Sequence, residues 1–195
     1  MVETKVTYLG VQITHGSRSL SSDWVQGILQ LPSPTTQKQL RAFLGLTGYC
    51  RIWIPNYGLI AWPLYENLKG RDDSIPLIWG APQKKAEATL KQALTQAPAL
   101  RLPDPEKAFQ LYVHEREGIA LGVLTQRLGS EPQPVAYLSK KLNPTTRGWP
   151  PCLRNLAAIA IMTEGALKLS FGFKLIFYQP PSETTPKWER PFMDV

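Results

Sequence analysis

The chain has 195 residues, 43% of them hydrophobic, which is enough for one large domain or two small domains with buried cores. Its net charge of +7 fits either a polyanionic partner or solubility by charge. The chain has only two cysteines and two histidines, which excludes a disulfide framework and a recognisable zinc cluster. Without a signal sequence or an apolar run of about 18 residues, we expect an intracellular setting such as the cytoplasm and no membrane partner.

The N-terminal segment predicts a β-hairpin over residues 1–20. Residues 5–13 alternate and are rich in β-branched and aromatic types, which is typical of a strand, and Gly16 would turn the chain back. A short helix follows, for which Ser22 or Asp23 can serve as the N-cap.

The segment Gln37–Tyr57 predicts the most informative helix of the chain. Thr36 and Gln39 fit a capping box at its start. One arc of the helix is apolar and formed by Leu40, Phe43, Leu44 and Thr47. The other side carries a basic, glycine-notched and aromatic face, called here the ridge, which consists of Lys38, Arg41, Gly45 and Tyr49. The glycine would let a bulky partner approach the backbone, although periodicity alone favours an ordinary solvated face.

A further helix over residues 59–68 would complete a small helical bundle spanning residues 21–80. The adjacent Asp72 and Asp73 lie in a polar loop, so we interpret them as solvated charge and not as a magnesium site. Two-metal phosphoryl chemistry needs carboxylates that hold ions about 4 Å apart, and no residue before Gly80 supplies such a set.

After Gly80 the pattern changes from helical to mixed. Residues 83–97 predict a helix, and the proline-rich residues 179–195 are expected to be disordered. Between them we expect three strands, a helix and a last strand at Phe109–Val113, Ile119–Arg127, Pro134–Leu138, Leu153–Leu169 and Lys174–Tyr178. Three antiparallel strands followed by a helix and another strand form the opening of an RNase H-like fold.

Six motifs occur in an order that identifies a family. They are PSPTTQKQLRAFLGLTGYCRIWIPNY, PLIWG, KQALTQAPALRLPDP, FQLYVHEREGIALGVLTQRLG, PVAYLSKKLNP and GWPPCLRNLAAIAI. Together they resemble the reverse transcriptases of retroviruses and retrotransposons, closest to the gammaretroviral type, over residues 5–176. The resemblance implies an α+β chain with three parts: a hairpin leaving the polymerase palm, a helical thumb over residues 21–80, and a truncated RNase H-like α/β connection domain over residues 81–178.

The resemblance also implies a nucleic-acid site. In a related thumb the helix equivalent to the ridge helix lies along the minor groove of the duplex, so the ridge would contact an RNA–DNA or DNA duplex. Lys140 and Lys141 fit a phosphate contact and an ordinary solvated turn equally well.

The resemblance also implies that the nuclease positions of the family are degenerate in this chain. An active RNase H fold holds two divalent ions with acids on the first strand, on the first helix and near the end of the fourth strand. The corresponding positions here are His114, Asn155 and the vicinity of Tyr178, none of them acidic, and Glu115 is the nearest carboxylate. We therefore expect no catalytic residue, no metal and no cofactor, although the parent enzyme uses Mg²⁺.

These observations predict a fragment of an endogenous-retrovirus Pol protein that holds duplex weakly and without sequence preference. It would lack both the polymerase palm and the RNase H carboxylates, and the rest of Pol is a further possible partner. Two alternatives stay open: a residual ribonuclease H, and a host-expressed remnant that binds another protein.

Overall fold

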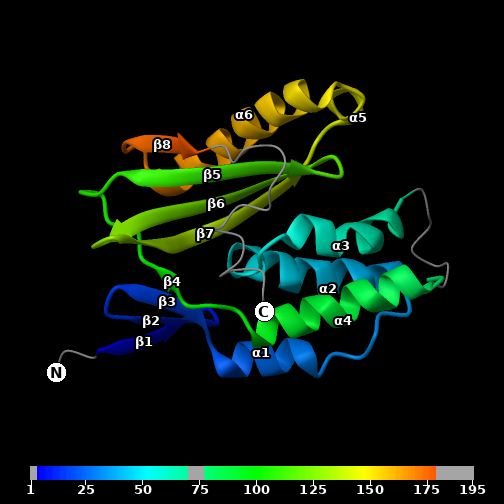
Figure 1. Ribbon diagram of the computed structural model, residues 1–195. Helices are drawn as coiled ribbons and strands as arrows, with labels where there is room; N and C mark the ends of the chain where they lie inside the picture. The colour runs from blue at the N-terminus through cyan, green and yellow to red at the C-terminus, as the bar shows by residue number, and fades with distance from the viewer. Residues whose placement is uncertain (1–3, 70–76, 179–195) are drawn as a thin grey trace. The chain divides into compact units, whose positions relative to one another are not determined.

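The computed structural model describes residues 4–69 and 77–178, which form two compact units that divide between Ala99 and Leu100 (Figure 1). The aspartate pair at 72–73 and the proline-rich residues 179–195 lie outside the described residues, so the expectations for them are not addressed. In the part of the chain that is described, no helix combines the length and apolarity needed to cross a membrane.

The first unit opens with an antiparallel meander of three strands, β1 (Lys5–Tyr8), β2 (Val11–Thr14) and β3 (Ser17–Leu20). The predicted hairpin with one turn is wrong here, because a second turn occurs at Leu9–Gly10. Both turn residues have positive φ, 48° for Leu9 and 78° for Gly10. Leucine is not a typical turn residue, so the alternating sequence conceals this turn.

The described residues of the first unit also form four α-helices and one 3₁₀ helix: α1 (Ser22–Leu29), α2 (Gln37–Tyr49), η1 (Cys50–Trp53), α3 (Tyr57–Glu66) and α4 (Ala81–Thr95). The capping box of α2 and the burial of its whole apolar arc are confirmed. The N-cap of α1 differs from both candidates, since the Oγ of Ser21 accepts a hydrogen bond from the backbone N–H of Trp24 at 3.3 Å.

Helix α4 belongs to the first unit, whereas the sequence placed it at the start of the second domain. Its buried apolar side chains, Ala86, Leu90 and Leu94, are part of the same hydrophobic core as the apolar arc of α2. Gly80, after which the sequence analysis began the second domain, is the N-cap of α4. The boundary between the two units lies after Ala99 instead.

The second unit contains β4 (Leu100–Arg101), β5 (Phe109–Arg116), β6 (Ile119–Leu128), β7 (Glu131–Lys141), α5 (Pro144–Arg147), α6 (Pro151–Ser170) and β8 (Leu175–Tyr178). Its main sheet has the order β7-β6-β5-β8, with β5 and β8 parallel and α6 as the crossover between them. The helix packs on β5, β6 and β7. The predicted succession of three antiparallel strands, a helix and a strand is confirmed, and with it the α/β fold of this unit.

Gly122 allows α6 to approach the sheet closely. A Cβ atom at this position would lie 3.2 Å from the Sδ of Met162 on α6 and 3.5 Å from a methyl group of Leu111 on β5. The side of β5 that carries Leu111 is therefore the side that faces α6. This assignment decides where the neighbouring side chains of β5 point.

Candidate nucleic-acid interface

The four ridge residues share the exposed side of α2. Lys38, Arg41, Gly45 and Tyr49 are all exposed, whereas the apolar arc on the other side of the helix is buried. A Cβ atom built on Gly45 would meet nothing within 4 Å, so the backbone there is open to an approaching molecule. The structure thus brings together the residues that the sequence selected.

The N-terminal part of the ridge is positively charged. Lys38 and Arg41 lie one helical turn apart, and the first turn of α2 contains no acidic residue. The positive end of the helix dipole adds to their field. The Nη2 of Arg41 donates to the Oε1 of the buried Gln37 at 3.2 Å, which orients the guanidinium group on the exposed face. This end of α2 can attract an anion such as a phosphate.

Tyr49 has a structural contact that the sequence did not reveal. Its hydroxyl donates to the carbonyl oxygen of Leu9 at 2.9 Å, and its ring lies 5.5 Å from that of Trp24 with the planes tilted by 59°. The tyrosine therefore links α2 to the β1–β2 turn, although 45% of it remains exposed. The two partners are 40 residues apart in sequence, so local patterning gave no signal for this contact.

Lys140 and Lys141 are the last two residues of β7 and do not form the solvated turn that was considered for them. They pair with Ala120 and Ile119 of β6, so the strand extends three residues beyond its predicted end at Leu138. Successive side chains of a strand point to opposite faces, and here only Lys140 is exposed while Lys141 is half-buried. The two amines therefore do not form a joint phosphate clamp.

Glu115, the carboxylate nearest to the nuclease position on β5, is part of a buried ion pair. Its Oε1 accepts the backbone N–H of Gly118 at 2.7 Å, and its Oε2 accepts from the Nε of Arg154 on α6 at 3.1 Å. The glutamate side chain is 5% exposed and that of Arg154 is 30% exposed. One oxygen of this carboxylate thus binds the turn between β5 and β6, and the other holds α6 on the sheet.

The structure does not bring His114 and Asn155 together. Glu115 and Leu111 lie on the side of β5 that faces α6, so the intervening His114 points to the opposite side of the sheet. Asn155 follows Arg154 on α6. Among residues 4–69 and 77–178, no group of three or more histidine, cysteine or acidic side chains could hold a metal ion.

Tyr178, which the resemblance places near the third nuclease position, makes an aromatic contact. The ring of Tyr178 stacks on that of Tyr112 with centroids 5.0 Å apart and planes inclined by 19°. The Nε2 of Gln110 donates to the hydroxyl of Tyr178 at 3.4 Å. The end of β8 is thus packed with aromatic side chains and carries no carboxylate among its described residues.

Comparisons with known proteins find similar sequences among retroviral Pol proteins. Residues 79–169 match the family model of the RNase H-like domain found in reverse transcriptase. The chain is 54% identical over 172 residues to the Gag-Pol polyprotein of avian reticuloendotheliosis virus, which covers 88% of the chain and 15% of that protein. It is 46% identical over 178 residues to the Pol polyprotein of feline endogenous virus ECE1, covering 91% of the chain and 17% of that protein. The chain therefore spans less than a fifth of these relatives.

Solved structures show the same fold. A foamy viral protease-reverse transcriptase in complex with double-stranded DNA aligns with 98% of this chain and 33% of its own length, with a TM-score of 0.82 and 23% identity. A foamy viral protease-reverse transcriptase in complex with an RNA/DNA hybrid aligns with 98% of this chain and 26% of its own, with a TM-score of 0.81 and 24% identity. At these identities the match establishes the fold.

Proposed function

We propose that this retroviral Pol-type chain, whose residues 79–169 match the RNase H-like domain of reverse transcriptase, holds a template–primer duplex without sequence preference. The observation that carries the proposal is the ridge, an exposed, positively charged helix face with an open backbone at Gly45. Support also comes from the neighbouring foamy viral structures, which contain double-stranded DNA or an RNA/DNA hybrid.

Each ridge residue has a distinct role in this proposal. Lys38 and Arg41 neutralise phosphates and release counterions, which makes affinity fall as salt rises. Gly45 lets one sugar–phosphate rail approach the helix backbone, and the exposed edge of Tyr49 packs on the sugars. One helix touches few phosphates, so the dissociation constant should lie near the nonspecific range of ~10⁻⁴–10⁻⁶ M.

The RNase H-like unit contributes structure in this proposal, and not cleavage. The parent fold uses Mg²⁺, but the donor set here does not fit a two-metal centre, because Glu115 is already paired with the guanidinium of Arg154 and His114 faces away from α6. Purified protein with Mg²⁺ or Mn²⁺ should therefore leave the RNA strand of a hybrid intact.

The first test measures binding of a fluorescent RNA–DNA hybrid by anisotropy across a salt titration. Arg41→Ala should reduce the slope of log K against log salt by about one, the share of a single phosphate contact. Lys85→Ala is the matched control, because Lys85 is an exposed cation on α4 outside the ridge, and its loss should leave the slope unchanged.

The second test separates shape from charge with two exposed helical glycines. A Cβ at Gly45 on α2 or at Gly27 on α1 would meet nothing within 4 Å, so a side chain can be added at either position without a clash at Cβ. Gly45→Leu should weaken hybrid binding with little change in salt slope, and Gly27→Leu should bind like the parent protein. If the Arg41 and Gly45 variants both bind like the parent, the ridge is only a solvated face and a protein-interaction role becomes the better explanation.

A further inference from the structure

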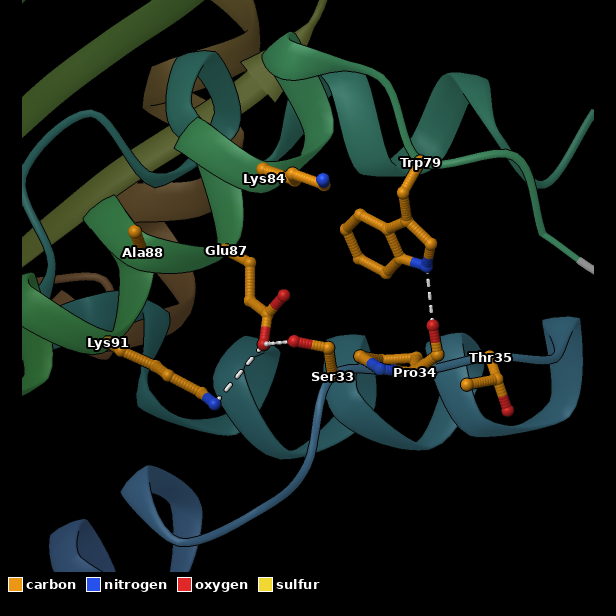
Figure 2. A pocket seen from close by; sticks show the side chains of 8 residues that line it. All are labelled: Ser33, Pro34, Thr35, Trp79, Lys84, Glu87, Ala88 and Lys91. Carbon is orange, nitrogen blue, oxygen red and sulfur yellow. Dashed lines mark hydrogen bonds and ion pairs between the residues drawn. The ribbon is translucent and has the colours of Figure 1, made fainter.

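A pocket of about 440 Å³ lies in the first unit between the segment that precedes α2 and the helix α4 (Figure 2). Its volume falls within the range of roughly 300–1,000 Å³ typical of small-molecule sites. The residues that line it are Ser33, Pro34, Thr35, Trp79, Lys84, Glu87, Ala88 and Lys91. None of them belongs to the ridge, so the proposed duplex site does not account for this pocket.

Glu87 presents an open acceptor to the pocket. Its side chain is 9% exposed, and its Oε1 accepts from the Oγ of Ser33 at 3.0 Å and pairs with the Nζ of Lys91 at 3.1 Å. Its Oε2 has no partner within the described residues, and Figure 2 shows this oxygen on the side where Lys84 and Trp79 lie. This oxygen is not a buried orphan but is open to the pocket, so it can accept a hydrogen bond from a ligand that supplies a donor.

Trp79 and Lys84 supply two further recognition elements. The indole N–H of Trp79 donates to the carbonyl oxygen of Pro34, which fixes the ring as one wall of the pocket. A fixed indole offers a flat apolar surface on which an aromatic ring can stack. Figure 2 shows the exposed Lys84 reaching toward this indole, so a cation lies beside the stacking surface.

The charged side chains that line the pocket determine which kind of ligand it can bind. Lys91 already balances the charge of Glu87, and Lys84 adds a second ammonium group, so a cationic ligand is disfavoured. The ligand that suits Glu87, Trp79 and Lys84 together has a neutral N–H donor on a flat ring and also carries an anionic group. We infer that the pocket binds a nucleotide, whose exocyclic amine donates to the Oε2 of Glu87 while its base stacks on Trp79 and its phosphate reaches Lys84.

The experiment titrates the full chain with AMP and with purine riboside 5′-monophosphate, which lacks the 6-amino group. Binding is followed by NMR through the indole N–H signal of Trp79, assigned by comparison with Trp79→Phe. We expect AMP to bind about tenfold more tightly, because hydrogen bonds to a charged group contribute the most. Glu87→Gln should abolish this preference, since its carbonyl would face Lys91 and Ser33 and its NH₂ group would face the pocket.

Lysine variants test the phosphate contact without touching the buried pair. Lys84→Ala should weaken AMP binding and leave adenosine binding unchanged, whereas Lys85→Ala, the adjacent exposed lysine, should do neither. Equal binding of the two nucleotides, no binding, or equal effects of the two lysine variants would overturn the inference, even if Glu87→Gln fails to fold. Comparing the affinities of AMP and of a 5′-phosphorylated single-stranded oligonucleotide shows whether the pocket prefers a free nucleotide or the nucleotide at the end of a strand. Arg41→Ala should leave AMP binding intact, which separates this pocket from the ridge.

Discussion

The ion pair between Glu115 and Arg154 gives the sharpest stability prediction. Removing one partner of a buried pair leaves the other charge uncompensated and typically costs 3–5 kcal/mol. The side chain of Glu115 is 5% exposed, but that of Arg154 is 30% exposed, so water would partly replace the lost guanidinium. The N–H of Gly118 would still bind one oxygen of the carboxylate. We therefore expect Arg154→Ala to lower the free energy of unfolding by about 2–4 kcal/mol.

Helix α6 also contains the matched control. Lys168 pairs with Glu164 at 3.4 Å, and these side chains are 74% and 63% exposed, so Lys168→Ala should cost less than about 0.5 kcal/mol. The measurement is amide hydrogen exchange of β5 under mild urea, which reports opening of the second unit and not of the whole chain. Similar losses from the two variants would refute the assignment of Glu115 as a structural anchor.

Three further predictions follow from contacts within the first unit and from the two thiols. Gly10→Ala should destabilise the chain by about 2 kcal/mol or more, measured by urea unfolding, because φ is +78° and the new Cβ would lie 2.6 Å from Trp24. A thiol reagent should modify the exposed Cys152 rapidly and the buried Cys50 only on unfolding, as mass spectrometry of the labelled protein would show; equal rates would contradict the buried position of Cys50. Burial raises the pKa of Tyr57, so stability should be complete below the ordinary tyrosine pKa of about 10 and fall as pH rises above it, and Tyr57→Phe should flatten that fall in alkaline thermal melts.

The features that could be predicted from the sequence are those determined by residues a few positions apart in the chain. The capping box joins Thr36 to Gln39, three residues away, and the arc that begins at Leu40 follows from the period of a helix. The ridge is the complement of that arc, so its exposure could be inferred together with the burial of the core face. The alternation and turn glycines of β5, β6 and β7 likewise predicted the order of strands.

The features that the sequence did not predict depend on contacts between distant residues. Tyr49 meets Leu9 across 40 residues, and Arg154 meets Glu115 across 39. The assignment of α4 to the first unit depends on which core its apolar face joins, and amphipathicity specifies a face without specifying its partner. The turn at Leu9 was missed because its residue type is unusual at positive φ.

The position of Glu115 connects the stability of the second unit to the question of its activity. The carboxylate of Glu115 is already paired with a cation, because its Oε2 accepts from the guanidinium of Arg154, and a divalent ion at this carboxylate would compete with that guanidinium. Metal binding at this site would therefore oppose the ion pair that holds α6 on the sheet. Duplex binding through the ridge requires neither a metal nor this carboxylate. In the proposed function, the strand that carries Glu115 therefore serves to pack α6 on the sheet, and the ridge alone contacts the duplex.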